Sequence, residues 1–202
     1  ILGGQEPAGI AIGSLVPFLF SMNDTGKIGG KKKALDLLIE LRKKLPNSFI
    51  HVLGAGGTMS YLMHYIGVDS LDNSGWIKKA GFGAIQMPGI SDRFIYHTEK
   101  RKSLDDDLHA LDSWLECVCP ACSSTLNRSK FYGKTEKARF LRAMHNVYVY
   151  QSEIIRLRKF IQEGRIREFV WKRLQNSIYR RLLEYVETKI NPRNNRKLDE
   201  FL

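Results

Sequence analysis

Short apolar runs alternate with longer amphipathic segments over the first part of the chain. The apolar runs at 9–13, 49–53 and 68–71 have the composition and the glycine boundaries of short buried strands. Between them, the segments 31–45 and 58–66 have the residue spacing of helices. This order of strands and helices, joined by short glycine turns, predicts a parallel α/β sheet or barrel.

The predicted helix at 31–45 is amphipathic, with lysines on the face opposite its apolar stripe. The stripe consists of Ala34, Leu37, Leu38, Leu41 and Leu45. Pro46 and Asn47 should end this helix. Further strands are predicted at 82–87 and 92–97. An eight-unit barrel needs roughly 250 residues, so the predicted α/β part would fill about half of one.

Two helical stripes follow in the last part of the chain, separated by Glu163 and Gly164. The first stripe comprises Val147, Tyr150, Ile154, Leu157 and Ile161, and the second comprises Trp171, Leu174, Ile178, Leu182 and Tyr185. Their spacing of three and four residues predicts a helical hairpin with apolar seams and basic outer faces.

Charge is distributed unevenly along the chain. The formal net charge is +11, from 32 Lys+Arg and 21 Asp+Glu. Residues 1–127 hold 13 basic and 13 acidic side chains, so the whole excess lies in 128–202, with 19 basic and 8 acidic side chains. The asymmetry favours a back half that faces a polyanion, nucleic acid first. Solvated basic faces of long helices are the alternative.

Membrane association is not expected from the sequence. No segment reaches the ~18 consecutive apolar residues of a membrane span, and no secretory signal is visible. Reduced cysteines without such a signal predict a cytoplasmic protein.

The most specific chemical signal is a cluster that holds every cysteine of the chain, Cys117, Cys119 and Cys122. Three cysteines cannot pair off into disulfides. Their spacing aims three thiolates at one point, and a histidine can complete a tetrahedral Cys3His zinc site. His145 is the preferred fourth ligand because it is predicted to open the first long helix. The other histidines are His51, His64, His97 and His109. No position is left for water, so the zinc would be structural.

Two further features follow predicted strands. The glycine-rich turn at 54–57 would let backbone N–H groups approach a ligand closely, although a tight turn that needs positive φ explains it equally well. Asp72 follows the third predicted strand, where barrel enzymes place their chemistry, and could act as a nucleophile. The alternative is that Asp69 or Asp72 caps the segment that follows.

Four stretches together resemble the tRNA-guanine transglycosylases, the family that installs queuine or archaeosine precursors. Residues 8–13 resemble the family's G-G-L-A-V-G base-binding turn, with Ala8 in place of its first glycine. Residues 51–56 are similar to its Y-L-M-G-V-G strand and turn, and residues 67–72 to G-V-D-x-F-D. The cysteine cluster followed by His145 and Asn146 matches the family's zinc ligands and its H-N helix start.

The resemblance implies an α/β fold, the C-terminal half of a (β/α)8 TIM-type barrel with a zinc-binding helical subdomain. Asp72 would attack C1′ of a guanosine nucleotide and displace guanine, and a 7-deazaguanine base would then replace the guanine. Gly9 and Ile10 would offer backbone groups to the base. Leu53 would pack on the base, and Gly54 would let the backbone come close. The ligands of a structural Zn²⁺ would be Cys117, Cys119, Cys122 and His145.

The resemblance also implies a pentosyltransferase that binds tRNA through its basic helices and takes the target nucleotide out of its stack. Residues 73–80 differ from the P-T-R-x-A-R run of the bacterial queuine-type enzymes. This difference keeps open a paralogous branch that inserts 7-deazaguanines into DNA.

The predicted organisation is a partial barrel at 1–116 and a basic zinc-binding subdomain at 117–202. The family's first half-barrel carries a second catalytic Asp, so the chain alone is expected to be inactive. A homodimer or a complementary N-terminal half-barrel chain is the expected protein partner. The competing hypothesis is a non-catalytic zinc-containing subunit that binds nucleic acid or a catalytic chain.

Overall fold

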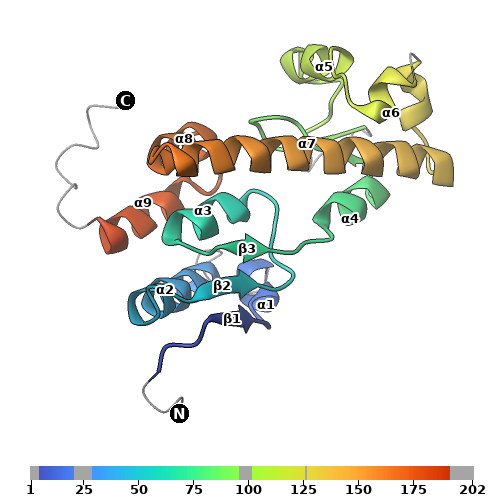
Figure 1. Ribbon diagram of the computed structural model, residues 1–202. Helices are drawn as coiled ribbons and strands as arrows, with labels where there is room; N and C mark the ends of the chain where they lie inside the picture. Colours follow the sequence, from blue (N-terminus) through green and yellow to red (C-terminus); the bar gives the residue numbers. More distant parts are fainter. Residues whose placement is uncertain (1–4, 21–28, 96–101, 126, 192–202) are drawn as a thin grey trace. The chain divides into compact units, whose positions relative to one another are not determined.

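The structure is a computed structural model that describes residues 5–20, 29–95, 102–125 and 127–191. It has a mixed α/β architecture in which helices predominate (Figure 1). None of the described helices combines the length and the apolar character needed to cross a membrane.

Contacts within the chain define two compact units. The first contains residues of Ile1–Asn73 and Ile166–Leu202, and the second is Ser74–Arg165. The boundary between 116 and 117 stays a prediction, and it lies at a different place from the limits of these units.

The first unit is built on a three-stranded parallel sheet of order β1-β2-β3. Strand β1 (Gly9–Ile12) pairs with β2 (Phe49–Val52), and β2 pairs with β3 (Ser70–Leu71). All three predicted strands are therefore present, each somewhat shorter than expected. Because the strands are parallel, the residues that follow them meet at one edge of the sheet.

Helices connect and cover these strands. The helices of the first unit are α1 (Val16–Phe20), α2 (Gly29–Lys44), α3 (Met59–Ile66), α8 (Ile166–Leu174) and α9 (Arg180–Ile190). Helix α2 lies between β1 and β2 in the chain, and α3 lies between β2 and β3, as predicted. Thr58 precedes α3, but its side chain makes no capping hydrogen bond.

The buried face of α2 is rotated from the predicted stripe. Its buried side chains are Ala34, Leu35, Leu38 and Ile39. Leu37, which was assigned to the stripe, is 45% exposed. The buried side chains are two adjacent pairs, four residues apart along the helix. The three- and four-residue spacing of apolar residues did not distinguish this stripe from the adjacent, predicted one.

A polar cluster centred on Glu187 holds three helices of the first unit together. The buried Glu187 carboxylate accepts hydrogen bonds from Tyr65 on α3 at 2.7 Å and from Trp171 and Arg167 on α8, both at 2.9 Å. Asn191 donates a further, longer bond of 3.3 Å. A buried charge with several donors is stable only while those donors stay in place, so this cluster fixes how the helices pack.

The second unit is mostly helical. Its elements are α4 (Gly75–Gly81), β4 (Ala84–Ile85), β5 (Arg93–Phe94), α5 (Leu108–Leu115), α6 (Pro120–Ser123), the 3-10 helix η1 (Arg128–Phe131) and α7 (Glu136–Gln162). Strands β4 and β5 were both predicted, but they pair antiparallel with each other and do not extend the parallel sheet. Residues 96 and 97 of the predicted second strand lie outside the described residues.

Helix α7 begins earlier than predicted. Thr135 caps it by accepting a hydrogen bond from the Ala138 N–H, so His145 lies inside the helix and does not open it. The expected break at Gly164 is present, with a φ of 68°. The second predicted stripe is divided between α8 and α9, and Ile178 between them is 87% exposed.

The core of the second unit surrounds the cysteine segment. Trp114 is fully buried and meets the Phe131 ring edge-on, with centroids 5.3 Å apart. Cys119 and Cys122 belong to the same apolar cluster as these two rings. The cysteine segment is therefore a packed part of this unit.

Candidate metal centre and carboxylate site

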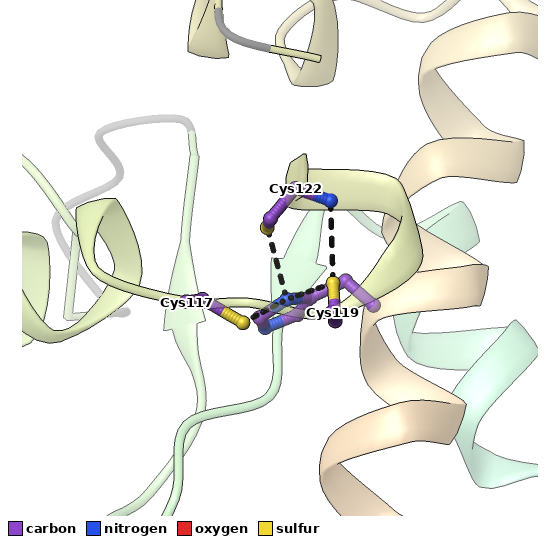
Figure 2. A group of neighbouring side chains, drawn as sticks. Cys117, Cys119 and Cys122 are labelled. Atoms are coloured by element: carbon purple, nitrogen blue, oxygen red, sulfur yellow. Dashed lines mark hydrogen bonds between the residues drawn. The ribbon is translucent and has the colours of Figure 1, made fainter. Parts of the chain in front are cut away.

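The three cysteines and His145 converge on one point in the second unit. Cys117 follows α5, Cys119 is the N-cap of α6 with Pro120 behind it, and Cys122 lies on α6. Figure 2 shows the three cysteine side chains turned toward one another. Their sulfurs and one histidine nitrogen all lie within 4.8 Å of one another. The predicted ligand set is thus assembled from α5, α6 and α7.

The geometry of this group fits zinc. The His145 Nδ1 atom lies 3.6 Å from the Cys117 sulfur and 3.5 Å from each of the sulfurs of Cys119 and Cys122. A tetrahedral ion with Zn–S bonds of about 2.3 Å and a Zn–N bond of about 2.0 Å separates nitrogen from sulfur by about 3.5 Å. Four protein ligands fill a tetrahedron, so a zinc ion held here would be structural.

The other histidines do not join this group. His51 and His64 belong to β2 and α3 of the first unit. His109 lies exposed on α5, and His97 lies outside the described residues. Among the described residues, His145 is the histidine that faces the three sulfurs.

His145 is oriented by the segment after β4. Its Nε2 atom lies 2.9 Å from the Gln86 carbonyl, which leaves Nδ1 to face the sulfurs. The neighbouring Asn146 accepts a hydrogen bond from the Gln86 N–H at 2.8 Å, and donates to the carbonyls of Trp76 and Ala84. Asn146 is fully buried. The His-Asn pair therefore fixes α7 to this segment and aims the imidazole.

Arg128 was not identified from the sequence, yet it holds the cysteine segment in shape. Its Nη1 atom donates to the carbonyls of Cys122 at 2.6 Å and Thr125 at 3.1 Å. Its Nη2 atom donates to the Leu115 carbonyl at 2.9 Å and to the Cys117 carbonyl at 3.5 Å. The guanidinium also lies over the Trp114 ring, 5.6 Å from its centroid. A single basic residue in a turn gives no pattern that would have revealed this role.

The ligands alter one another's protonation. Hydrogen bonds from Cys119 and Cys122 hold the pKa of the Cys117 thiol far below its usual range. Burial lowers the pKa of His145, but its hydrogen bonds to Cys117 and Cys119 outweigh burial and raise the pKa to about 9. A metal must displace the protons that remain, so metal binding should weaken as the pH falls.

A cavity of about 210 Å³ lies beside this centre. Cys117, His145 and Tyr148 line it, and the half-buried Cys117 is the least enclosed of the three sulfurs. Solvent therefore approaches the centre from the Cys117 side.

Asp72 lies at the edge of the parallel sheet in the first unit. Its Oδ1 atom accepts a hydrogen bond of 2.6 Å from the Gly54 N–H, so the turn after β2 contacts the carboxylate that follows β3. The Asp72 side chain is 60% exposed. The N-cap position of the helix that follows, α4, is held by Ser74, two residues after Asp72.

Asp69 has a different and structural role. Its Oδ2 atom accepts a hydrogen bond of 2.8 Å from the Ile50 N–H and pairs with Arg42 of α2 at 2.5 Å. Asp69 therefore connects α2 to the sheet, and this structural role differs from the role proposed for Asp72.

The backbone conformation of the turn at 54–57 requires glycine. Gly54 and Gly57 have φ angles of 71° and 69°, which favour glycine. A Cβ atom on Gly56 would lie 2.2 Å from the Asn73 side chain. The sequence suggested that the backbone of this turn comes close to a ligand. In the structure it comes close to Asn73 and Asp72 of the same chain.

The structure brings only two of the four predicted base-contacting residues near Asp72. Leu53 and Gly54 follow β2 at the edge where Asp72 lies, and Leu53 is 44% exposed. Gly9 and Ile10 pair with Phe49 and Ile50 at the opposite end of β1 and β2, roughly 10 Å further back. The contact of Gly9 and Ile10 with a base stays a prediction.

Two residues that the sequence did not single out do reach the edge. Gly13 and Ser14 follow β1, and a Cβ atom on Gly13 would contact the Leu53 side chain at 3.8 Å. Ser14 has a φ of 61°, which is uncommon for a residue other than glycine. Its unusual backbone could not be read from the sequence, because nothing in Gly-Ser-Leu requires positive φ at serine.

Comparisons with known proteins show which proteins the chain is similar to. The chain is 29% identical to the tRNA-guanine(15) transglycosylase of Pyrococcus abyssi over 86% of its own length and 27% of the relative. It is 26% identical to the enzyme of that name from Methanococcus aeolicus, over 87% of this chain and 25% of the relative. It is 28% identical to the enzyme of that name from Archaeoglobus fulgidus, over 81% of this chain and 30% of the relative. The chain thus spans about a quarter of the length of these curated relatives.

A family profile covers more of the sequence than any single motif. The profile of the queuine tRNA-ribosyltransferase family matches residues 4–178, a range that contains the sheet, Asp72 and the cysteine centre. Because this match extends over most of the 202 residues, the chain belongs to the queuine tRNA-ribosyltransferase family.

Proposed function

We propose that this chain is part of an enzyme that exchanges guanine in tRNA for a 7-deazaguanine base, with Asp72 as the nucleophile. The observation that carries the proposal is the Asp72 carboxylate, which lies exposed at the edge where parallel strands end and is held there by the Gly54 N–H. Enzymes built on such sheets place their reacting groups at this edge. The names of the relatives make guanine 15 of tRNA the first position to assay.

The proposed reaction is a double displacement at C1′ of the nucleotide. The free carboxylate oxygen of Asp72 forms a bond to C1′ as the bond between C1′ and guanine N9 breaks. The electron pair goes to guanine, which also takes a proton from a general acid in the rest of the enzyme. A deprotonated 7-deazaguanine base then attacks C1′ and releases the carboxylate. A carboxylate suits this role because it is a good leaving group from an oxocarbenium-like centre.

The edge around Asp72 offers the surroundings that a flipped base needs. Leu53 is an exposed apolar side chain, suited to pack on a base face. Gly13 and Ser14 lie at the same edge as Leu53 and would add to the contacts proposed for Gly9 and Ile10. A base brought here must first leave its stack in the RNA.

Helix α7 provides basic groups for phosphates. Lys137 and Arg139 are exposed near its start, with the exposed Phe140 beside them, and Arg158 and Lys159 are exposed near its end. Cations interleaved with an aromatic side chain are typical of surfaces that bind RNA. The zinc centre, by orienting α7 at His145, would hold this helix in place.

The half-barrel and the dependence on further chain are part of the same proposal. Three parallel strands with connecting helices supply only part of a closed barrel. Catalysis should therefore require the remainder of the enzyme, either in a longer chain or in a partner.

The test uses the full-length protein that contains this chain. It should incorporate labelled 7-deazaguanine base into tRNA, with duplex DNA assayed in parallel. Asp72→Asn should abolish incorporation, and zinc content and thermal stability should stay at the wild-type level. Retained exchange in Asp72→Asn would refute Asp72 as the nucleophile. Salt-dependent RNA binding without any exchange by the wild-type protein would favour the non-catalytic subunit, and exchange into DNA alone would favour the DNA-acting branch.

A further inference from the structure

His51 lies between two functional groups of the parallel sheet. It is opposite Ser70 in the register of β2 and β3. Its Nδ1 atom lies 2.9 Å from the Ser70 hydroxyl, and its Nε2 atom lies 3.7 Å from Oδ1 of Asp72. The ring is 25% exposed, so the contact with Asp72 is only partly screened by water.

The carboxylate decides which ring nitrogen carries the proton. If Nδ1 were protonated in the neutral ring, the Nε2 lone pair would face the negative Oδ1 atom, which is unfavourable. If Nε2 is protonated, its proton lies on the nitrogen nearer to the negative Oδ1 atom, and the Ser70 hydroxyl can donate to Nδ1. Both contacts are then favourable, so Ser70 and Asp72 select the same tautomer.

This arrangement makes the two oxygens of Asp72 unequal. Oδ1 accepts a hydrogen bond from the Gly54 N–H at 2.6 Å, and the Nε2 atom of His51 lies on the same side at 3.7 Å, within electrostatic range but beyond hydrogen-bond distance. The interactions of the carboxylate within the described residues involve Oδ1, which leaves Oδ2 as the oxygen available for attack. The Gly54 hydrogen bond and the nearby His51 ring both favour the orientation in which Oδ1 faces the sheet.

We infer that His51 is a positioning residue that, with Gly54, holds Oδ1 of Asp72 so that Oδ2 faces C1′. The inference rests on the proposed function, because it assigns His51 a role in the step that Asp72 performs. Ser70 supports His51 by fixing the tautomer. A histidine that merely filled the sheet would gain nothing from an Nε2 atom directed at an exposed carboxylate.

Two substitutions separate positioning from packing. His51→Gln places an amide N–H near the position of Nε2 and can still donate to Asp72. His51→Asn ends near the position of Nδ1, so it keeps a polar group beside Ser70 and loses the donor to Asp72. His109→Asn provides a matched control, since it makes the same replacement at an exposed histidine of the second unit.

The variants are compared in the full-length enzyme by kcat and KM for base exchange. The His51–Asp72 contact is longer than a hydrogen bond and partly exposed, so its loss should change the rate by roughly 3- to 10-fold. His51→Asn should therefore lower kcat by that factor with little change in KM for tRNA, and His51→Gln should recover most of the loss. Wild-type kcat in His51→Asn would overturn the inference. An equal loss of kcat in both variants would also overturn it, because the role would then be structural.

The Asp72→Asn variant keeps this test distinct from the test of the proposed function. If Asp72→Asn is inactive and His51→Asn keeps wild-type kcat, only the role of His51 fails. If Asp72→Asn retains exchange, the nucleophile assignment fails, and the positioning role fails with it.

Discussion

Replacing Arg128 with methionine should loosen the zinc centre without touching a ligand. The Arg128 guanidinium donates to four carbonyls of the segment that carries the cysteines, and three of these bonds are 3.1 Å or shorter. At about 1 kcal/mol for each of the three, their loss should cost about 3 kcal/mol. The contact with the Trp114 ring adds about 0.5 kcal/mol. Methionine keeps the apolar stem but none of the donors.

Much of this cost should appear in metal affinity. The shape of the cysteine segment and the binding of the ion are coupled, since a structural zinc site forms as its surroundings fold. A loss of about 3 kcal/mol corresponds to a roughly 100-fold increase in Kd, so Arg128→Met should weaken zinc binding by 10- to 100-fold. Arg128→Lys keeps the charge but loses the fork that reaches separate carbonyls, so it should give an intermediate value.

Competition with a chromophoric chelator measures the zinc affinity, and thermal unfolding of the zinc-loaded protein measures the stability. Arg158→Met is the matched control, because Arg158 is an exposed arginine on α7 of the same unit. If Arg128→Met binds zinc as tightly as Arg158→Met does, the carbonyl bonds do not maintain the ligand geometry and the reasoning is wrong.

Three other predictions concern separate parts of the chain. Cys119→Ser should prevent stable zinc binding, because Cys119 is both a ligand candidate and the N-cap of α6. Elemental analysis after dialysis measures the bound zinc, and zinc retained at one equivalent would contradict the ligand set. Gly56→Ala should lower the free energy of unfolding by about 2 kcal/mol or more, since the new Cβ atom would lie 2.2 Å from the Asn73 side chain. Denaturant unfolding measures this change, and an unchanged midpoint would show that the turn can move away from Asn73. Burial raises the pKa of Glu187, but hydrogen bonds from Tyr65 and Trp171 and the charge of Arg167 outweigh burial and lower the pKa below 4.5. The stability gained from this carboxylate should therefore be present above about pH 4.5 and be lost as the pH falls through the lowered pKa. Glu187→Gln should then cost about 2 kcal/mol at pH 7 and progressively less below pH 4.5, and a cost independent of pH would contradict the assignment.

The sequence predicted the elements that depend on local apolar patterning. The three strands of the sheet and helices α2 and α3 are present where they were expected. The start of α7 was missed for a physical reason. Its first buried stripe contains Ala138, Leu141, His145 and Val149 at helical spacing, and Arg142 and Asn146 beside it are also buried. Polar residues that are buried because they make specific hydrogen bonds do not look apolar, so the stripe was not visible.

The metal ligands could be predicted because their chemistry and spacing are local, whereas their support could not. Cys117, Cys119 and Cys122 lie within six residues, and short separation makes convergence almost inevitable. Arg128 and Asn146 act through carbonyl and amide groups of the backbone, which every residue possesses. Only the folded structure shows which backbone carbonyl and amide groups lie next to the Arg128 and Asn146 side chains.

Strand register decided which predicted base-contacting residues reach Asp72. Gly9 and Ile10, which the sequence assigned to the base-binding site, pair with Phe49 and Ile50 earlier along the strands, and their contact with a base stays a prediction. The same register aligns His51 with Ser70 and sends Leu53 and Gly54 to the edge beside Asp72. In a parallel sheet a residue's function thus depends on how far along its strand it lies, because ligands bind outside the carboxyl ends of the strands. The glycine turn after β2 adds to this arrangement, since its backbone N–H fixes one oxygen of the carboxylate and leaves the other for chemistry.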